Sequence, residues 1–277
     1  MQAPCLVLCG VDDRSAVRVY CALRDRLGSK AVELVSAEEM ALAPGWRHTI
    51  ESGRVDTVLT LPGGRRLQME QMGLVFQRIQ QVDVPQFQGS RPDDREFALA
   101  EMQALLLSWL AGLPCPVVNR AGPRGLCGAQ RSRFEWLALA VSAGLPTRGF
   151  ELVSEARRFG RSSLSPHVPV SGALLDDPPP MPQAALLGRA PAQYLEPIDS
   201  LQHRVLVAGG RCLNVPPDTS AEGFLNLARL SGESLLEIRL GRIRGEWRFC
   251  GATTIPEIPP EAAGFVADSL AELREAA

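Results

Sequence analysis

Two short apolar runs flank an amphipathic stretch at the start of the chain, and this pattern constrains the fold strongly. Cys5–Cys9 is continuously apolar, Ser15–Leu27 carries apolar residues at helical spacing, and Ala31–Val35 is apolar except for Glu33. A strand, a helix and a strand in so short a span form a βαβ unit, with parallel strands and a right-handed crossover. The first turn holds one glycine, Gly10, so the GxGxxG dinucleotide fingerprint is absent.

A β-hairpin and a further buried strand are predicted next. Val55–Leu61 alternates between apolar and polar residues, and Arg65–Met69 returns after a Pro-Gly-Gly turn. Gly73–Ile79 has the pattern of a core strand. Arg78 lies at its carboxyl end, where open α/β sheets bind ligands. Arg78 is therefore a candidate substrate-binding residue, and a salt bridge to Asp83 is the alternative.

The segment 108–154 joins two halves of the chain. A long helix, Arg95–Gly112, precedes prolines that prevent its continuation. Val117–Asn119 is a short strand, and the glycine-rich loop Ala121–Gly128 then changes the chain direction. We expect an α/β domain over 1–122 and a second domain over 123–277. The predicted buried face of the long helix consists of Phe97, Met102, Leu105, Leu106 and Trp109.

The second half mixes helices with paired strands. A helix is predicted over Gln130–Ala143, with Phe134, Leu137 and Val141 on one face. The region 162–182 is rich in proline, serine and glycine; it contains one candidate strand, Val168–Leu175, before a polyproline-like connection. The remaining predicted strands are Gly149–Val153, Tyr194–Ile198, His203–Ala208, Arg211–Val215, Ser234–Leu240 and Glu246–Cys250, and the remaining predicted helices are Ser220–Leu230 and Phe265–Ala276.

Composition narrows the classes of partner. The 277 residues carry a formal net charge of -2 and only 5% aromatic residues, which disfavours nucleic acid and anionic membranes. Lys30 is the only lysine, so chemistry that needs an amine has one candidate. The cysteines show no CxxC spacing, and no stretch predicts a signal peptide or a membrane span. We therefore expect a soluble, cytoplasmic protein in a reducing compartment.

Three collinear stretches carry a resemblance to a known family. The first is PVVN with an arginine-bearing loop and AGLPT, the second is YLEPIDSLQHRVLVAGGRC, and the third is SLLEIRLGRIRGEWRFCGATTIPEI. In this order they resemble the ATP-grasp superfamily, and the RimK-like group in particular. The resemblance implies an α/β chain: an N-terminal Rossmann-like pre-ATP-grasp domain, 1–122, followed by a reduced α+β ATP-grasp-like domain, 123–277.

The resemblance also assigns roles to individual residues. Glu196 matches the linker glutamate that contacts the nucleotide, and Arg204 matches a strand position that contacts substrate or phosphate, which makes it the candidate catalytic residue. Glu237 matches the first metal-binding carboxylate. Arginines could neutralise phosphate in place of lysine. Candidates for that cofactor-binding role are Arg131 and Arg133. Independently of the resemblance, Arg78, Asn119 and Arg120 near the junction are candidates for binding a small-molecule substrate.

The chain departs from the family pattern at the positions that bind the metal ions and the ATP phosphates. Where the family has glutamate-x-asparagine as the second metal position, this chain has Gly251-Ala252-Thr253. The lysines that hold ATP phosphates have no counterpart, and the segment between Ser154 and Ala192 is proline-broken and shortened. Glu257 is a loop carboxylate that could also turn toward the metal position. A magnesium pair needs several oxygen ligands, so the site is interpreted as degenerate.

Three functions stay open at this point. The first is an ATP-grasp-like binding or regulatory partner with lost or reduced catalysis. The second is a divergent Mg-ATP-dependent carboxylate–amine ligase that acts on a peptide or small molecule. The third is a small-molecule-binding α/β protein with its ligand at the junction. ATP and magnesium are expected as cofactors only if the site is functional, and the expected partners are a small molecule, a peptide or another protein.

Overall fold

The first structural layer is a parallel sheet. The computed structural model describes residues 3–68, 71–153, 165–167, 192–199 and 202–276. The predicted βαβ unit is confirmed as β1 (Cys5–Cys9), α1 (Arg14–Leu27) and β2 (Val32–Ser36). With β6 (Leu74–Gln77) and β7 (Val117–Val118) these strands form a parallel sheet in the order β2-β1-β6-β7. β1 is apolar throughout because both of its faces are buried.

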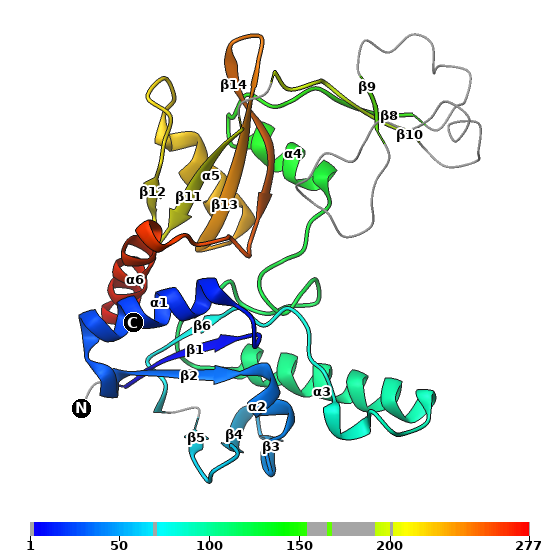
Figure 1. Ribbon diagram of the computed structural model, residues 1–277, viewed down its shortest axis with the longest axis vertical. Coiled ribbons are helices and arrows are strands. Elements are labelled where there is room, and N and C mark those ends of the chain that lie inside the picture. The colour runs from blue at the N-terminus through cyan, green and yellow to red at the C-terminus, as the bar shows by residue number, and fades with distance from the viewer. Residues whose placement is uncertain (1–2, 69–70, 154–164, 168–191, 200–201, 277) are drawn as a thin grey trace.

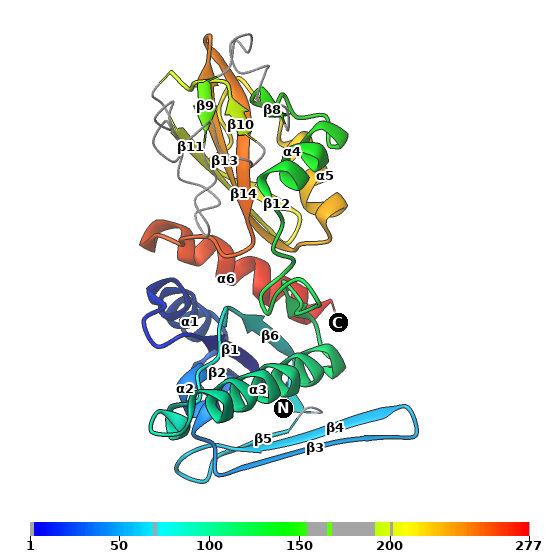
Figure 2. The same cartoon turned by 90° about the vertical axis from the view of Figure 1, so that its right-hand side faces the viewer.

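Helices cover both faces of the parallel sheet (Figures 1 and 2). α1 packs on one face, and α3 (Pro92–Gly112) packs on the other, next to the one-turn helix α2 (Ala37–Ala41). Phe97 does not belong to the buried face that the sequence predicted, since it is 68% exposed. The reason is that the buried residues of α3 all lie in its second half, namely Leu106, Trp109 and Leu110.

A small antiparallel sheet lies beyond α3. The predicted hairpin is confirmed as β4 (Arg54–Thr60) and β5 (Arg66–Gln68), and the structure adds β3 (Gly45–Glu51) on the other side of β4. The turn between β3 and β4 uses Ser52 and Gly53, both with positive φ. In Figure 2 the β3–β4 hairpin runs along the bottom of the molecule and extends past the other elements.

A second large sheet is antiparallel. It consists of β11 (Gln202–Ala208), β12 (Arg211–Leu213), β13 (Leu235–Ile243) and β14 (Glu246–Thr253) in the order β12-β11-β13-β14. The turn between β11 and β12 is Gly209-Gly210, as predicted, and both glycines have positive φ. The hairpin of β13 and β14 contains a register shift at Arg239/Leu240.

Two helices cover one face of this antiparallel sheet. They are α4 (Arg133–Ser142) and α5 (Ala221–Ser231), and both contribute to the same buried cluster as the sheet. The predicted buried face of α4 is wrong at Phe134 and Val141, which are 58% and 63% exposed. Apolar residues occur on both sides of α4, and the sheet covers the side that carries the Trp136 ring and leaves the Phe134 ring exposed. The side chains that α4 buries are Trp136, Leu137 and Ala140.

A three-stranded sheet lies at the far end of the molecule (Figure 1). Its order is β8-β10-β9, with β8 (Phe150–Val153), β9 (Ser165–His167) and β10 (Ala192–Leu195) paired antiparallel. The candidate strand Val168–Leu175 and the polyproline-like connection 176–182 lie outside the described residues.

The last helix connects the two large sheets. α6 (Pro260–Glu275) begins earlier than predicted, with a proline at its first position, where the missing amide proton costs nothing. It packs beside α1, and in Figure 2 it lies between the two large sheets. One buried cluster therefore contains side chains of β1, α1, β11 and α6. Among the described residues, no helix is both long and apolar enough to cross a membrane.

Candidate functional site

Charged side chains lie on the face of the antiparallel sheet that α4 and α5 do not cover. In β13, Leu236 and Ile238 pack into the cluster beneath those helices. Successive side chains of a strand point to opposite faces, so Glu237 and Arg239 lie on the other side. Arg204 of β11 is in register with Arg239 and shares that face. Period-2 alternation thus brings together two of the predicted site residues, Arg204 and Glu237.

Both carboxylate oxygens of Glu237 have partners. Arg239 Nε donates to Oε1 at 2.9 Å, and Arg204 Nε lies 3.9 Å from the same oxygen. The backbone N–H of Glu257 donates to Oε2 at 3.2 Å. The Glu237 side chain is only 3% exposed, so these donors compensate a buried negative charge. We call Arg204, Glu237, Arg239 and Glu257 the arginine–glutamate face.

The donor set of this face does not fit a magnesium site. The residues of β14 opposite Glu237 and Arg239 are Thr253 and Gly251, neither of which has a carboxylate. Magnesium takes near-octahedral oxygen ligands, and here the Glu237 carboxylate is bonded by Arg239 while the Glu257 carboxylate is bonded by Arg204. The described residues contain no group of three or more His, Cys, Asp or Glu side chains suited to a metal ion.

Glu196, which the resemblance matches to the linker glutamate, lies between β10 and β11 and contacts the turn end of the β13–β14 hairpin. Glu196 Oε2 accepts from the backbone N–H of Gly149 at 3.1 Å and from Arg248 Nη1 at 3.4 Å. Arg244 Nη2 lies 3.5 Å from Oε1, and Arg148 Nε donates to the Glu196 carbonyl. Glu196 is buried, and its carboxylate connects the start of the β8-β10-β9 sheet to the β13–β14 hairpin.

A hollow of about 620 Å³ lies beside the arginine–glutamate face. It is lined by the carboxyl ends of β1 and β6, the start of α1 and residues 255–257. Arg78 lines it and forms a two-point pair with Asp13, at 2.7 and 3.3 Å, while Asp83 pairs with Arg95 instead. Arg78 is 5% exposed, and its Nη1 has no hydrogen-bond partner among the described residues.

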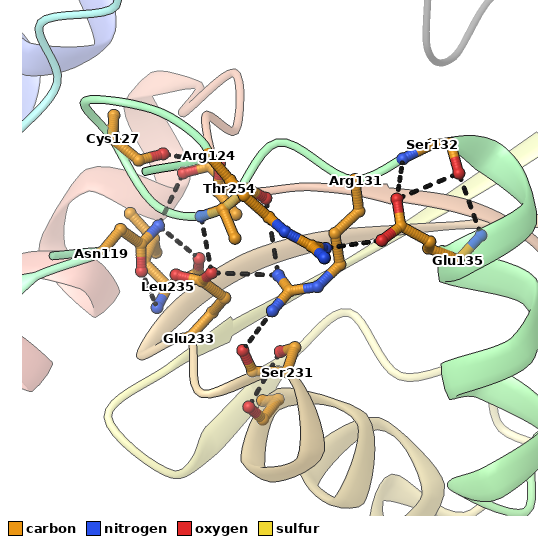
Figure 3. Close-up of polar contacts among 12 residues, drawn as sticks. Asn119, Arg124, Cys127, Arg131, Ser132, Glu135, Ser231, Glu233, Leu235 and Thr254 are labelled. Carbon is orange, nitrogen blue, oxygen red and sulfur yellow. Dashed lines mark hydrogen bonds and ion pairs between the residues drawn. The ribbon is translucent and has the colours of Figure 1, made fainter. Parts of the chain in front are cut away.

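Asn119 lies in a separate cluster, at the joint between the two large sheets (Figure 3). Its Nδ2 donates to the carbonyls of Leu235 and Thr254, both at 2.7 Å, and its Oδ1 accepts from Leu235 N at 3.0 Å. The residue is 2% exposed, so its amide is fully engaged in joining the first sheet to β13 and the end of β14.

The two arginines predicted to bind a cofactor, Arg131 and Arg133, lie just before and at the start of α4. Arg131 contacts Glu233 at 3.1 Å and the Ser231 carbonyl at 2.7 Å, and its guanidinium lies 5.0 Å from the Trp136 ring centroid. Figure 3 shows this guanidinium directed toward the chain between α5 and β13. Arg133 is the first residue of α4. Arg131 therefore bonds to groups outside the arginine–glutamate face.

Arg120 contacts the end of α3. Its guanidinium donates to carbonyls in the last turn of that helix and just beyond it, with distances from 3.1 to 3.5 Å. A cation at a helix C-terminus is favourable because the carbonyls there lack partners. The carbonyls belong to Leu110, Ala111, Leu113 and Cys115.

Several residues of the two clusters were not predicted as site residues. Asp13, which follows β1, binds Arg78, and Glu233 binds both Arg131 and the backbone of the 119–132 loop. Arg239 follows from alternation, since it lies two positions after Glu237 on the same strand. Asp13 and Glu233 have no such local signal, because their partners are distant in sequence.

Comparison of the sequence with protein-family models and with curated proteins gives no match. Solved structures do match. A RiPP-associated ATP-grasp ligase from Chryseobacterium gregarium, in complex with ADP and a leader and core peptide, superposes with TM-score 0.73 at 13% identity, covering 98% of this chain and 97% of that chain. The macrocyclase MdnC from Microcystis aeruginosa MRC, bound with precursor peptide MdnA, gives 0.73 at 15% identity, with 96% and 99% covered.

A RimK domain ATP-grasp protein from Sphaerobacter thermophilus gives TM-score 0.53 at 13% identity, with 96% of this chain and 99% of that chain covered. The chain has an ATP-grasp fold. The predicted fold class, an α/β domain followed by an ATP-grasp-like α+β domain, is therefore confirmed. The three matches cover 96% to 98% of this chain.

Proposed function

We propose that this protein binds a peptide on its arginine–glutamate face and in the adjoining hollow, with a degenerate metal site and lost or reduced ligase catalysis. The observation that carries the proposal is the pairing of Glu237 with Arg239 and Arg204. These arginines contact the carboxylate that the resemblance assigns to a metal ion, and the facing strand contributes Gly251 and Thr253. A buried carboxylate with these partners is already neutralised.

Two further observations support a peptide as the ligand. Two of the structural neighbours named above are described in complex with peptides: the Chryseobacterium ligase and MdnC. In this chain, Arg78 lines the hollow together with residues 255–257, and Arg204, from the other large sheet, binds Glu257. Arginine binds carboxylates with two parallel hydrogen bonds, so this surface suits a peptide with acidic side chains.

The seven cysteines bear on the cellular compartment. All of them are free thiols, which supports a reducing compartment such as the cytoplasm.

The alternative is an active Mg-ATP-dependent carboxylate–amine ligase that acts on a peptide. The named ligases with the same fold favour it, and so does the place of Glu196 on the linker beside Arg248. In that case Glu196 would contact the nucleotide and Arg204 would neutralise the acidic group of the substrate.

A small-molecule ligand at the junction is the third candidate. Of the three residues proposed for it, Arg78 lines the 620 Å³ hollow. Asn119 and Arg120 bond to backbone groups of the chain.

Calorimetry tests the proposal with a capped tetra-aspartate peptide, its tetra-asparagine counterpart, and ATP with and without magnesium. We expect the aspartate peptide to bind without magnesium and the asparagine peptide to bind weakly or not at all. Glu261, exposed in the first turn of α6, supplies the matched control variant Glu261→Gln for Glu237→Gln. ATP binding that needs magnesium and is lost in Glu237→Gln alone would overturn the degenerate site. Peptide-dependent ADP formation would establish the ligase.

A further inference from the structure

The side chain of Glu257 lies on the arginine–glutamate face as if it were a bound acid. Its Oε2 accepts from Arg204 Nη1 at 2.9 Å. The Glu257 side chain is 69% exposed and lines the 620 Å³ hollow, whereas Glu237, which its backbone N–H contacts, is almost fully buried. Glu257 therefore provides the one solvent-facing carboxylate of the four residues that form this face.

The guanidinium group of Arg204 binds this carboxylate directly, and the charges of two further arginines, from other elements, also act on it. The pKa of Glu257 is lowered, first by the hydrogen bond and charge of Arg204, and further by Arg18 of α1 and Arg239 of β13. Arg18 is held in place because its Nη1 donates to the Ile258 carbonyl at 2.9 Å. The fold thus supplies arginines from α1, β11 and β13, and their positive charges all stabilise a carboxylate at the position of Glu257.

We propose that Glu257 is an internal occupant of an anion site, and that a carboxylate of the bound peptide displaces it from Arg204. This inference rests on the proposed function and adds its regulation. An exposed ion pair is weak, so displacement costs little. Pro256 and Pro259 restrict the backbone on either side of Glu257. The exchange therefore requires only rotation of the Glu257 side chain, while Glu237 keeps its partners.

Titration of Glu257→Gln with the capped tetra-aspartate peptide tests the exchange. We expect about fivefold tighter binding than in the native protein, the size of an exposed ion pair. Arg204→Gln should weaken binding by at least the same factor. Glu261→Gln removes one negative charge four positions along the chain and controls for a general change in charge; its affinity should stay that of the native protein. Circular dichroism checks that each variant is folded.

A second probe, inorganic pyrophosphate, separates this inference from the proposed function. Tighter pyrophosphate binding by Glu257→Gln, with no variant binding the peptide, would support the anion site and overturn the peptide function. Peptide binding that is equal in the native protein and Glu257→Gln would overturn the exchange and leave the function standing. If Glu261→Gln bound both probes as much more tightly as Glu257→Gln does, the exchange would also be overturned, because the gain in affinity would then come from net charge.

Discussion

At the scale of single residues, Asn119 combines an unusual backbone conformation with a demanding set of partners. Its φ is 52°, in the left-handed region that asparagine tolerates better than most residues. Its amide satisfies buried groups that are more than a hundred positions away in sequence. The sequence predicts a turn at this position, and the long-range partners come from the tertiary fold alone.

Replacing Asn119 with alanine should lower the free energy of unfolding by about 3 kcal/mol, because the amide N–H and carbonyls of its partners stay buried without bonds. Urea denaturation measures the loss. Asn214 is exposed and has a φ of 60°, so Asn214→Ala reports the backbone term alone. We expect that variant to lose about 1 kcal/mol. Equal losses in the two variants would show that the side-chain bonds of Asn119 contribute nothing.

Buried thiols provide a second prediction at this scale. Burial raises the pKa of Cys9 to about 11 and that of Cys127 to about 12. A raised pKa keeps a thiol protonated until the pH approaches that value, so both should stay unreactive at pH 8 in the native protein. Cys21 is exposed and should react first with a thiol reagent. Rapid labelling that persists in Cys21→Ser, with Cys127 among the modified residues, would contradict this.

At the scale of elements, the start of α4 is set by a capping box. Ser132 Oγ accepts from the Glu135 N–H at 3.2 Å, and Glu135 Oε2 accepts from the Ser132 N–H at 2.9 Å. The helix therefore begins at Arg133, three residues after the predicted Gln130. Ser132 Oγ also donates to Glu135 Oε2 at 3.1 Å. The bonds that this carboxylate accepts lower the pKa of Glu135: first the bond from the Ser132 backbone, then that from its hydroxyl, then that from Arg124.

Ser132→Ala should raise the pKa of Glu135 back toward its ordinary value, because the hydroxyl bond is lost. A lowered pKa means that the ionised carboxylate stabilises the fold above its ordinary pKa, and that this effect disappears as the pH falls through the lowered value. The difference in stability between Ser132→Ala and the native protein should therefore shrink in acid. Carboxyl NMR titration checks the pKa, with Ser142→Ala at the other end of α4 as the control. An unchanged pKa in Ser132→Ala would contradict the assignment.

At the scale of the whole molecule, α6 makes the two large sheets part of one core. Leu270 is 2% exposed and belongs to the cluster that contains β1, α1 and β11. Trp109 reports on the cluster around α3, and Trp136 reports on the cluster beneath α4 and α5. The described residues of both halves are thus connected through apolar contacts and through the hydrogen bonds of Asn119 to Leu235 and Thr254.

Leu270→Ala should lower the free energy of unfolding by about 3 kcal/mol, since it leaves a cavity in a shared core. Tryptophan fluorescence and circular dichroism should show coincident transitions, in the variant as in the native protein. Leu42→Ala, at a leucine that is 47% exposed, supplies the control with little loss. Two separate transitions, with only one of them shifted, would show that the two halves unfold independently.

Local patterns allowed much of the architecture to be predicted. Glycine hairpins, apolar strands and helical spacing are short-range signals, so the βαβ unit, the β11–β12 hairpin and most helices were expected near their observed positions. The errors arose where burial depends on distant neighbours. Phe97 and Phe134 have the same apolar character as the residues that are buried, and only the placement of α3 and α4 decides which side of each helix is covered.

The same division holds for the candidate site. The sequence by itself determined the residue types: a lone carboxylate at Glu237, no second one at Gly251 or Thr253, and arginine in place of lysine. Strand alternation also placed Arg239 beside Glu237. Only the tertiary structure decided that Arg204 and Glu257 complete the group, since their pairing requires β11 and the loop after β14 to meet. Charge partners that are far apart in sequence are chosen by packing, and packing leaves no local pattern.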